Sequence, residues 1–403
     1  MTKIDIHRYE KRIENALRRI KNGDLLEINK RTLLEFYEYL DAEGLSRGRI
    51  AKYLFHLLKI NGWLNLPFEQ ATKNDIVKLV RTIENQNYTP NTKHDYKIVI
   101  KRFYKWLRST EECPLEVKWI KCTVKESDVR LPEELLTAEE INKLINAATH
   151  PRNKAMIALL YESGCRVGEL LSLQRKNIVF DEFGALVTLE GKTGMRKIRV
   201  MSSVPYLSTW IENHPWKEKP DFPLWTSISN HNQRTPILYT HFKKMLVDMA
   251  KKAGITKRVN PHSFRHSRAS KMANHLTDAQ MNNYFGWVQG SDMPATYVHL
   301  SGRDMDNAIF KMNGMKTEKL EQSEDFRPKI CHHCEKPNPS AGKLCLRCGA
   351  ILDVETIMKI DDKWKNMNSV MVELLKDPKV FDLLMDKMKQ MNVNSMHTDH
   401  SLY

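Results

Sequence analysis

Six side chains between residues 166 and 297 are of the types that a protein uses to break and rejoin a phosphodiester through its own nucleophile. The pentavalent phosphate of such a reaction needs cationic donors around its non-bridging oxygens. The nucleophile must lose a proton, and the departing 5′ oxygen must gain one. A phenol suits the nucleophile because its pKa of about 10 is well below that of an alcohol. The six residues are Arg166, Lys192, His262, Arg265, Trp287 and Tyr297.

Residue type and spacing suggest a part for the four basic members of this set. Arg166 and Arg265 are predicted to clamp the phosphate, because a guanidinium fork matches phosphate geometry. Lys192 lies in a glycine-flanked tight turn, from which its ammonium could protonate the leaving oxygen. His262 precedes Arg265 by three residues, so both share one helix face. Its imidazole could support the phosphate or take the proton of the nucleophile.

Tyr297 is the predicted nucleophile, and Trp287 offers an indole N–H donor and bulk that could hold the phenol. Tyr284 is the alternative nucleophile, although its position before the turn at Gly286 favours a place in the core. Singly, each of the six residues has a simpler explanation as a surface ion pair, a solvated lysine, a helix cap or a core aromatic. Their joint occurrence in this order favours catalysis. Three neighbours are interpreted as structural: Cys165, His266 and His299.

Helices and one small sheet are expected to position these residues. Residues 1–112 show apolar positions at helical spacing and are predicted to form a helical core-binding domain that clamps DNA. An ordinary bundle with basic, solvated faces fits that pattern equally well. Residues 113–135 contain two prolines and little periodicity, which is typical of a linker. A capping box at Thr137 then opens a second domain over residues 136–315.

The second domain is predicted to be mostly helical around one small sheet. Short strands are expected at residues 178–180, 185–189 and 197–200, with turns at Gly184 and at 191–194. The predicted fold class is therefore mainly α with a small antiparallel sheet (α+β).

The motifs in their order resemble the active-site set of the tyrosine recombinases, the lambda-integrase family. They are Arg166-Val167-Gly168-Glu169-Leu170, Lys192 in its hairpin, His262-Ser263-Phe264-Arg265-His266, Gly286-Trp287 and Tyr297. The resemblance covers residues 1–312 and implies a C-shaped clamp of two domains around duplex DNA. It implies that Tyr297 attacks to leave a 3′-phosphotyrosine and a free 5′ hydroxyl, and that four protomers exchange strands through a Holliday junction. Many members have His where this chain has Trp287.

Four of the seven cysteines form two Cys-x-x-Cys knuckles: Cys331, Cys334, Cys345 and Cys348. Together they offer four thiolates to a tetrahedral ion, and Zn²⁺ is the expected metal. A zinc ribbon over residues 325–352 is predicted, closed and structural, whereas catalysis is expected to need no metal. His332 and His333 are alternative ligands, and unliganded or redox thiols are the alternative explanation. A recombinase with such an appended ribbon resembles archaeal integrase-like proteins.

The net charge of +15, from 64 Lys and Arg against 49 Asp and Glu, suggests double-stranded DNA as partner. Residues 1–120 carry 23 basic and 16 acidic residues, a net +7, whereas residues 353–403 carry 7 and 9, a net −2. The second segment is predicted to be an amphipathic, Met-rich helical tail that packs within the chain or between protomers. No apolar run reaches the roughly 20 residues of a membrane helix, and no signal core opens the chain, so a cytoplasmic, DNA-associated protein is expected.

The sequence therefore predicts a site-specific DNA recombinase or integrase that acts as a homo-oligomer, a tetramer on paired sites. Two alternatives are a zinc-ribbon DNA-binding or regulatory protein without cleavage activity, and a type IB topoisomerase-like strand relaxase. Integration, excision and dimer resolution stay open, as do delivery of Tyr297 in cis or in trans.

Overall fold

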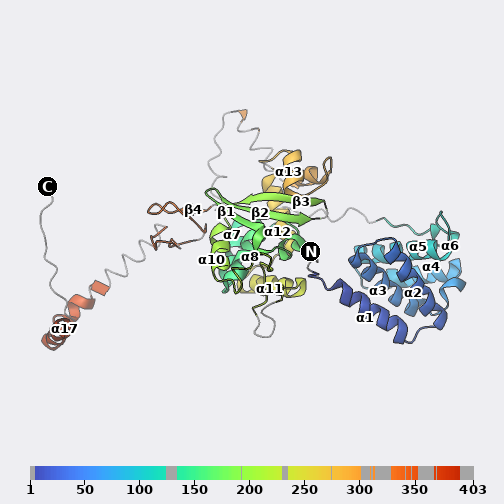
Figure 1. Cartoon of the computed structure of the whole chain (residues 1–403), viewed down its shortest axis with the longest axis horizontal. Helices are drawn as coiled ribbons and strands as arrows, with labels where there is room; N and C mark the ends of the chain where they lie inside the picture. Colours follow the sequence, from blue (N-terminus) through green and yellow to red (C-terminus); the bar gives the residue numbers. More distant parts are fainter. Residues whose placement is uncertain are drawn as a thin grey trace.

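The computed structural model describes residues 5–123, 134–191, 193–228, 235–273, 275–300, 309, 312–313, 328–340, 342–345, 347–352, 367–368 and 370–390. Within these residues the chain forms a helical bundle, a mixed domain with a three-stranded sheet, a small two-stranded unit and a C-terminal helix (Figure 1). The predicted fold class, mainly α with a small antiparallel sheet, is confirmed.

The helical bundle forms because each of its longer helices buries one apolar face against the others. Three aromatic rings lie at its centre, with Phe103 5.1 Å from Phe36 and 4.9 Å from Phe68, both nearly edge to face. Such ring pairs add to the burial of apolar surface. The elements are α1 (Tyr9–Asn22), α2 (Glu27–Ala42), α3 (Arg47–Leu64), η1 (Phe68–Gln70), α4 (Lys73–Asn85), α5 (Pro90–Leu107) and α6 (Leu115–Lys118). Val117 and Ile120 are buried in this core, so the start of the segment interpreted as a linker packs in the bundle.

The mixed domain is built around α8, which is buried on almost every side. The capping box predicted at Thr137 opens α7, and α8 ends where Gly164 adopts a left-handed conformation, with a φ of 54°. The helices are α7 (Ala138–Ala147), α8 (Pro151–Ser163), α9 (Val167–Leu171), η3 (Arg175–Asn177), α10 (Val204–Glu212), α11 (Tyr239–Lys252), α12 (Pro261–Met272), α13 (Asp278–Phe285) and α14 (Met293–Leu300).

Three antiparallel strands in the order β1-β2-β3 form the sheet of this domain, and their bounds are Ile178–Asp181, Gly184–Gly191 and Gly194–Val200. The register pairs Ile178 with Val187, and it pairs Gly191 with Gly194 at the far end of the second hairpin. Val187, Leu189 and Val200 are buried, so one face of the sheet covers the helical core. The turn between β2 and β3 therefore lies at the end of the sheet where Gly191 pairs with Gly194.

The first described residues belong to the mixed domain rather than to the bundle that follows them. Ile6 is buried in the core of the mixed domain, and its carbonyl oxygen accepts a hydrogen bond of 3.1 Å from the Tyr239 amide. The His7 ring lies between Tyr9 and Tyr239, at 5.0 and 4.9 Å. The chain thus leaves one core, builds the bundle and returns.

The two-stranded unit comprises β4 (Lys329–Ile330) and β5 (Pro337–Asn338), and it lies against the mixed domain on the side away from the bundle (Figure 1). The Ser340 hydroxyl donates a hydrogen bond of 3.1 Å to Oδ1 of Asn142 in α7. Further along, α17 (Pro378–Gln390) exposes apolar side chains that include Phe381, Leu383 and Met385. Among the helices described here, none combines the length and apolarity that crossing a bilayer requires.

Candidate active site

Arg166 lies at the mouth of the site, at the residue that precedes α9. Its own amide and its Nη1 donate to the Glu169 carboxylate at 2.9 and 3.0 Å, and its Nη2 donates to the Gly286 carbonyl at 3.1 Å. The ion pair with Glu169 that would explain Arg166 as purely structural is therefore present. About a third of the Arg166 side chain (32%) remains accessible, whereas Glu169 is almost fully buried.

Arg265 lies deeper, on α12, and only 3% of it is exposed. Nη1 donates to the Gly164 carbonyl at 2.9 Å and Nη2 to the Phe285 carbonyl at 2.8 Å. Burial lowers the pKa of Arg265 to about 10, which still leaves the guanidinium charged at neutral pH. It also lies 5.1 and 5.2 Å from the ring centres of Phe285 and Trp287. The structure thus builds a fixed positive charge into the floor of the site.

The predicted nucleophile is next to this charge. The Tyr297 ring stacks on Trp287 at 5.5 Å with an interplanar angle of 9°, and Trp287 in turn stacks on Phe285 at 4.9 Å. The Tyr297 hydroxyl is 2.8 Å from Nδ1 of His266. Only 2% of Tyr297 is exposed, so the phenol is held inside the domain.

The alternative nucleophile occupies a different environment. The Tyr284 hydroxyl donates to the Glu162 carbonyl at 3.0 Å, and burial raises the pKa of this phenol to about 12. A hydroxyl engaged with the backbone and harder to ionise is a poor nucleophile. The geometry therefore favours Tyr297 over Tyr284.

His262 and Lys192 complete the predicted set. His262 is exposed near the start of α12, and its ring lies 5.1 Å from that of His266. Lys192 is outside the described residues. Its neighbour Thr193 donates a hydrogen bond of 3.1 Å to the Gly286 carbonyl, the same oxygen that accepts from Arg166. The β2–β3 hairpin, the start of α9 and the end of α13 therefore meet at Gly286.

A cavity of about 1000 Å³ opens beside these groups, between the mixed domain and the bundle. Its lining includes Arg166, Glu169 and His262 from the mixed domain, and Glu10 and Arg47 from the bundle. The cavity therefore reaches the partly exposed Arg166 and the exposed His262, whereas Tyr297 is buried and is not among its lining residues.

Two residues of the site were missed from the sequence. His266 was interpreted as structural, yet it contacts the Tyr297 hydroxyl; its position four residues after His262, on the same helix face, is the signal. The second is Arg196, which forms a two-pronged ion pair with Glu169 at 3.1 and 2.8 Å. In a strand every second residue faces the same way, and Arg196 has the parity of the buried Ile198 and Val200.

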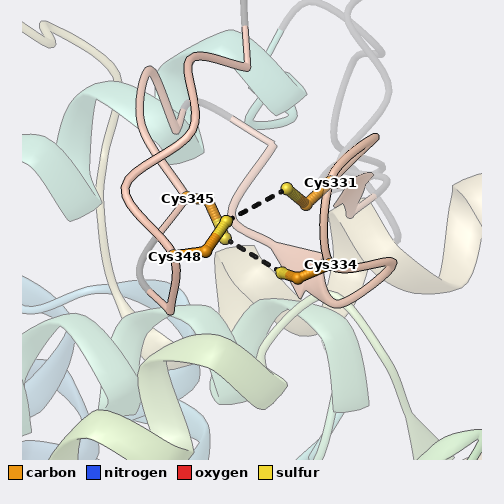
Figure 2. Close-up of side chains that lie close together, drawn as sticks. All are labelled: Cys331, Cys334, Cys345 and Cys348. Atoms are coloured by element: carbon orange, nitrogen blue, oxygen red, sulfur yellow. Dashed lines mark hydrogen bonds between the residues drawn. The ribbon is translucent and has the colours of Figure 1, made fainter.

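The four predicted metal ligands lie together in the two-stranded unit (Figure 2). Their sulfur atoms all lie within 4.8 Å of one another, and the pairs Cys331–Cys348 and Cys334–Cys345 are 3.6 Å apart. Four thiolates at about 2.3 Å around a tetrahedral Zn²⁺ would be about 3.8 Å apart, so this cluster fits such an ion. Figure 2 shows the two knuckles facing each other with all four sulfurs turned inward.

The chain has clear relatives. Residues 134–303 match the family described as the Phage integrase family. Tyrosine recombinase XerA of Pyrococcus horikoshii is 26% identical over 304 residues, which cover 74% of this chain and 96% of the relative. XerA of Pyrococcus furiosus is 25% identical over 293 residues, which cover 71% and 95%.

Solved structures share the fold. XerH site-specific recombinase in a post-cleavage complex with palindromic difH substrate aligns with a TM-score of 0.53 at 16% identity, over 77% of this chain and 98% of that one. A lambda integrase dimer bound to a COC′ core site gives 0.54 at 18% identity, over 68% and 77%. Residues 134–303 thus form a domain that matches the Phage integrase family, and the chain is similar to tyrosine recombinases over about three quarters of its length.

Proposed function

We propose that this protein is a site-specific DNA recombinase that cuts and rejoins duplex DNA through a 3′-phosphotyrosine at Tyr297. The observation that carries the proposal is the stack of the Tyr297 ring on Trp287, whose ring centre is 5.2 Å from the Arg265 guanidinium. A phenol beside a permanent cation is what a phosphoryl transfer through tyrosine requires. The match to the Phage integrase family supports the reaction type, and the net charge of +15 supports DNA as the substrate.

In this reaction the Tyr297 oxygen forms a bond to phosphorus while the bond from phosphorus to the 5′ oxygen breaks. Arg166 and Arg265 neutralise the non-bridging oxygens, and Lys192 gives the 5′ oxygen its proton. The phenol proton passes to an imidazole. The candidates are His266, which is hydrogen-bonded to the hydroxyl, and His262, whose ring is next to that of His266. The phosphotyrosine keeps the energy of the broken bond, so the reverse steps rejoin the strand without metal or ATP.

The buried phenol sets a condition on this sequence of events. A phosphate cannot contact a hydroxyl that is enclosed by Trp287 and His266, since only 2% of Tyr297 is accessible. The cavity that reaches Arg166 and His262 is the entry route for a DNA backbone. Cleavage therefore requires α14 to shift once a phosphate has bound at Arg166.

Peptide mapping of a trapped adduct tests the proposal. A nicked duplex from the source genome loses a short 5′ fragment after cleavage, which prevents rejoining and accumulates the covalent complex. We expect mass spectrometry to place the DNA on the peptide that contains Tyr297. An adduct on Tyr284, or no adduct with any duplex that the protein binds, would contradict the assignment. The second result would favour a DNA-binding protein without cleavage activity.

We further propose that the protein assembles as a tetramer on two DNA sites. Solved relatives in the family include a lambda integrase tetramer bound to a Holliday junction, with a TM-score of 0.51 to this chain. A requirement for two copies of the site, with junction products visible on native gels, would support recombination. Relaxation of a supercoiled plasmid carrying a single site, without junctions, would indicate a topoisomerase-like relaxase instead.

We propose that Cys331, Cys334, Cys345 and Cys348 hold one structural Zn²⁺. The four sulfurs lie within 4.8 Å of one another, and a unit of this size has too little apolar core to fold alone. Structural zinc contributes roughly 10 kcal/mol or more to the folding of such small units. Held closed by four thiolates, the ion would have no open position for catalysis.

Replacing Cys345 with Ser should remove the metal and unfold the two-stranded unit. We expect elemental analysis to give one zinc per chain for the wild-type protein and none for Cys345→Ser, with faster proteolysis after residue 328. Cys113→Ser is the matched control, because Cys113 lies half-buried in the bundle, and its zinc content should stay at one. Wild-type protein purified without zinc, yet resistant to proteolysis there, would contradict the zinc assignment.

A further inference from the structure

Arg196 is a nearly buried arginine on β3 whose charge is fully paired inside the site. Only 7% of its side chain is accessible, and its partner Glu169 is 3% accessible. Nη1 and Nη2 of Arg196 donate to the two carboxylate oxygens of Glu169 at 3.1 and 2.8 Å. Two parallel hydrogen bonds of this kind fix the orientation of both groups.

The Glu169 carboxylate is shared between two arginines. Its Oε1 accepts from Arg166 as well as from Arg196, and its Oε2 accepts from the Arg166 amide. Although burial opposes ionisation, the hydrogen bond and charge of Arg196 and the Arg166 donors hold the pKa of Glu169 below its usual range. The carboxylate therefore stays ionised and lies as a bridge between Arg196 and Arg166.

Arg196 also shapes the turn that holds the other side of Arg166. Its Nε donates to the Tyr284 carbonyl at 2.8 Å. Two residues on, Gly286 has a φ of 61°, and a Cβ there would lie 2.7 Å from Nη1 of Arg196. The Gly286 carbonyl accepts the hydrogen bond from Nη2 of Arg166. Arg196 thus contacts both groups that orient the Arg166 fork.

We propose that Arg196 is a positioning residue for phosphate binding, which acts by fixing Arg166 through Glu169 and through the Gly286 turn. This inference rests on the proposed function of Arg166 as a phosphate clamp. Arg166 is itself partly exposed, so its side chain would sample other orientations without these two contacts. The same contacts tie β3, and with it the hairpin that carries Lys192, to the turn before Trp287.

The test compares two scissile groups in a nicked duplex: an ordinary phosphate, and a methylphosphonate in which one charged oxygen is replaced by methyl. Because the methylphosphonate carries no negative charge, its transition state depends less on the positive charge of Arg166. With the phosphate, Arg196→Met should slow formation of the adduct about 100-fold, as expected for loss of one oriented donor. With the methylphosphonate, the difference from wild type should fall to within about tenfold, in parallel with Arg166→Ala.

Arg199→Met is the matched control. Arg199 lies on the same strand and also makes a two-pronged ion pair, with Asp181 at 2.7 and 2.8 Å, but on the exposed side of the sheet. The Arg199→Met variant should cleave both substrates at the wild-type rate. Where Arg196→Met does not fold, Arg196→Lys, which keeps the charge but not the fork, is compared in the same way.

An equal loss on both substrates for a folded Arg196 variant would overturn the proposal, because a general structural defect does not depend on the charge of the scissile group. Such a loss would leave the proposed function intact, since the wild-type protein still forms the adduct. Absence of an adduct from wild-type protein on either substrate would remove both assignments.

Discussion

Replacing Tyr297 with Phe should abolish the covalent adduct with DNA while binding of the duplex persists. The change removes only the hydroxyl, so the ring keeps its stack on Trp287 and loses one hydrogen bond with His266, worth about 0.5–1.5 kcal/mol. Without a nucleophile we expect the rate of adduct formation to fall by roughly 10⁴-fold or more. Denaturing gels with a labelled nicked duplex measure the adduct, and mobility shifts measure binding.

Tyr284→Phe provides the control for this experiment. It deletes a hydroxyl of the same kind, one that donates to the Glu162 carbonyl in the same domain. We expect a modest loss of stability and adduct formation near the wild-type rate. Retention of the adduct in Tyr297→Phe, with its loss in Tyr284→Phe, would transfer the nucleophile to Tyr284.

Replacing Arg265 with Met should reduce both cleavage and stability. The substitution fills a similar volume but leaves the Gly164 and Phe285 carbonyls without their donors, at a cost of about 1–3 kcal/mol for each buried group. Loss of the fixed cation should slow adduct formation a further 10²–10³-fold, roughly, under conditions where the variant is folded. Urea unfolding measures the loss of stability. Single-turnover cleavage, measured well below the melting temperature of the variant, gives the loss of activity separately.

Arg152 offers a matched comparison for Arg265. It is also buried, with 5% exposed, and donates to a backbone carbonyl, that of Thr226, at 2.6 Å. Burial lowers the pKa of Arg152 to about 10, as it does for Arg265. Arg152→Met should therefore lose comparable stability without the specific loss of cleavage. Equal cleavage rates for the two folded variants would show that Arg265 acts only in folding.

Local signals in the sequence were enough to predict most of the elements around the site. The start of α7 at the Thr137 capping box and the hairpin turn at residues 191–194 follow from the preferences of capping residues and of glycine. Helix α14, which carries Tyr297, was not predicted. Its eight residues are too few, and too uniformly apolar, to show a helical period.

The contacts within the site depend on packing that spacing does not reveal. His262 and Arg265 could be placed on one helix face from their separation. The position of Tyr297 against His266, and of Arg196 against Glu169, depends on how α12, α14 and the sheet pack. Alternation along β3 would have placed Arg196 on the buried face with Ile198 and Val200, so polar residues at such positions are also candidates for buried contacts.

The early return of the chain to Ile6 has a mechanical consequence. The backbone passes between the two cores twice, once between Ile6 and Ile13 and again between Ile120 and Leu136. Two connections restrict the relative movement of the bundle and the mixed domain more than a single connection would. A fragment cut to start at residue 134 would lack the bundle and also Ile6, so the core of the mixed domain would lose a buried side chain and the Tyr239 amide its hydrogen-bond acceptor.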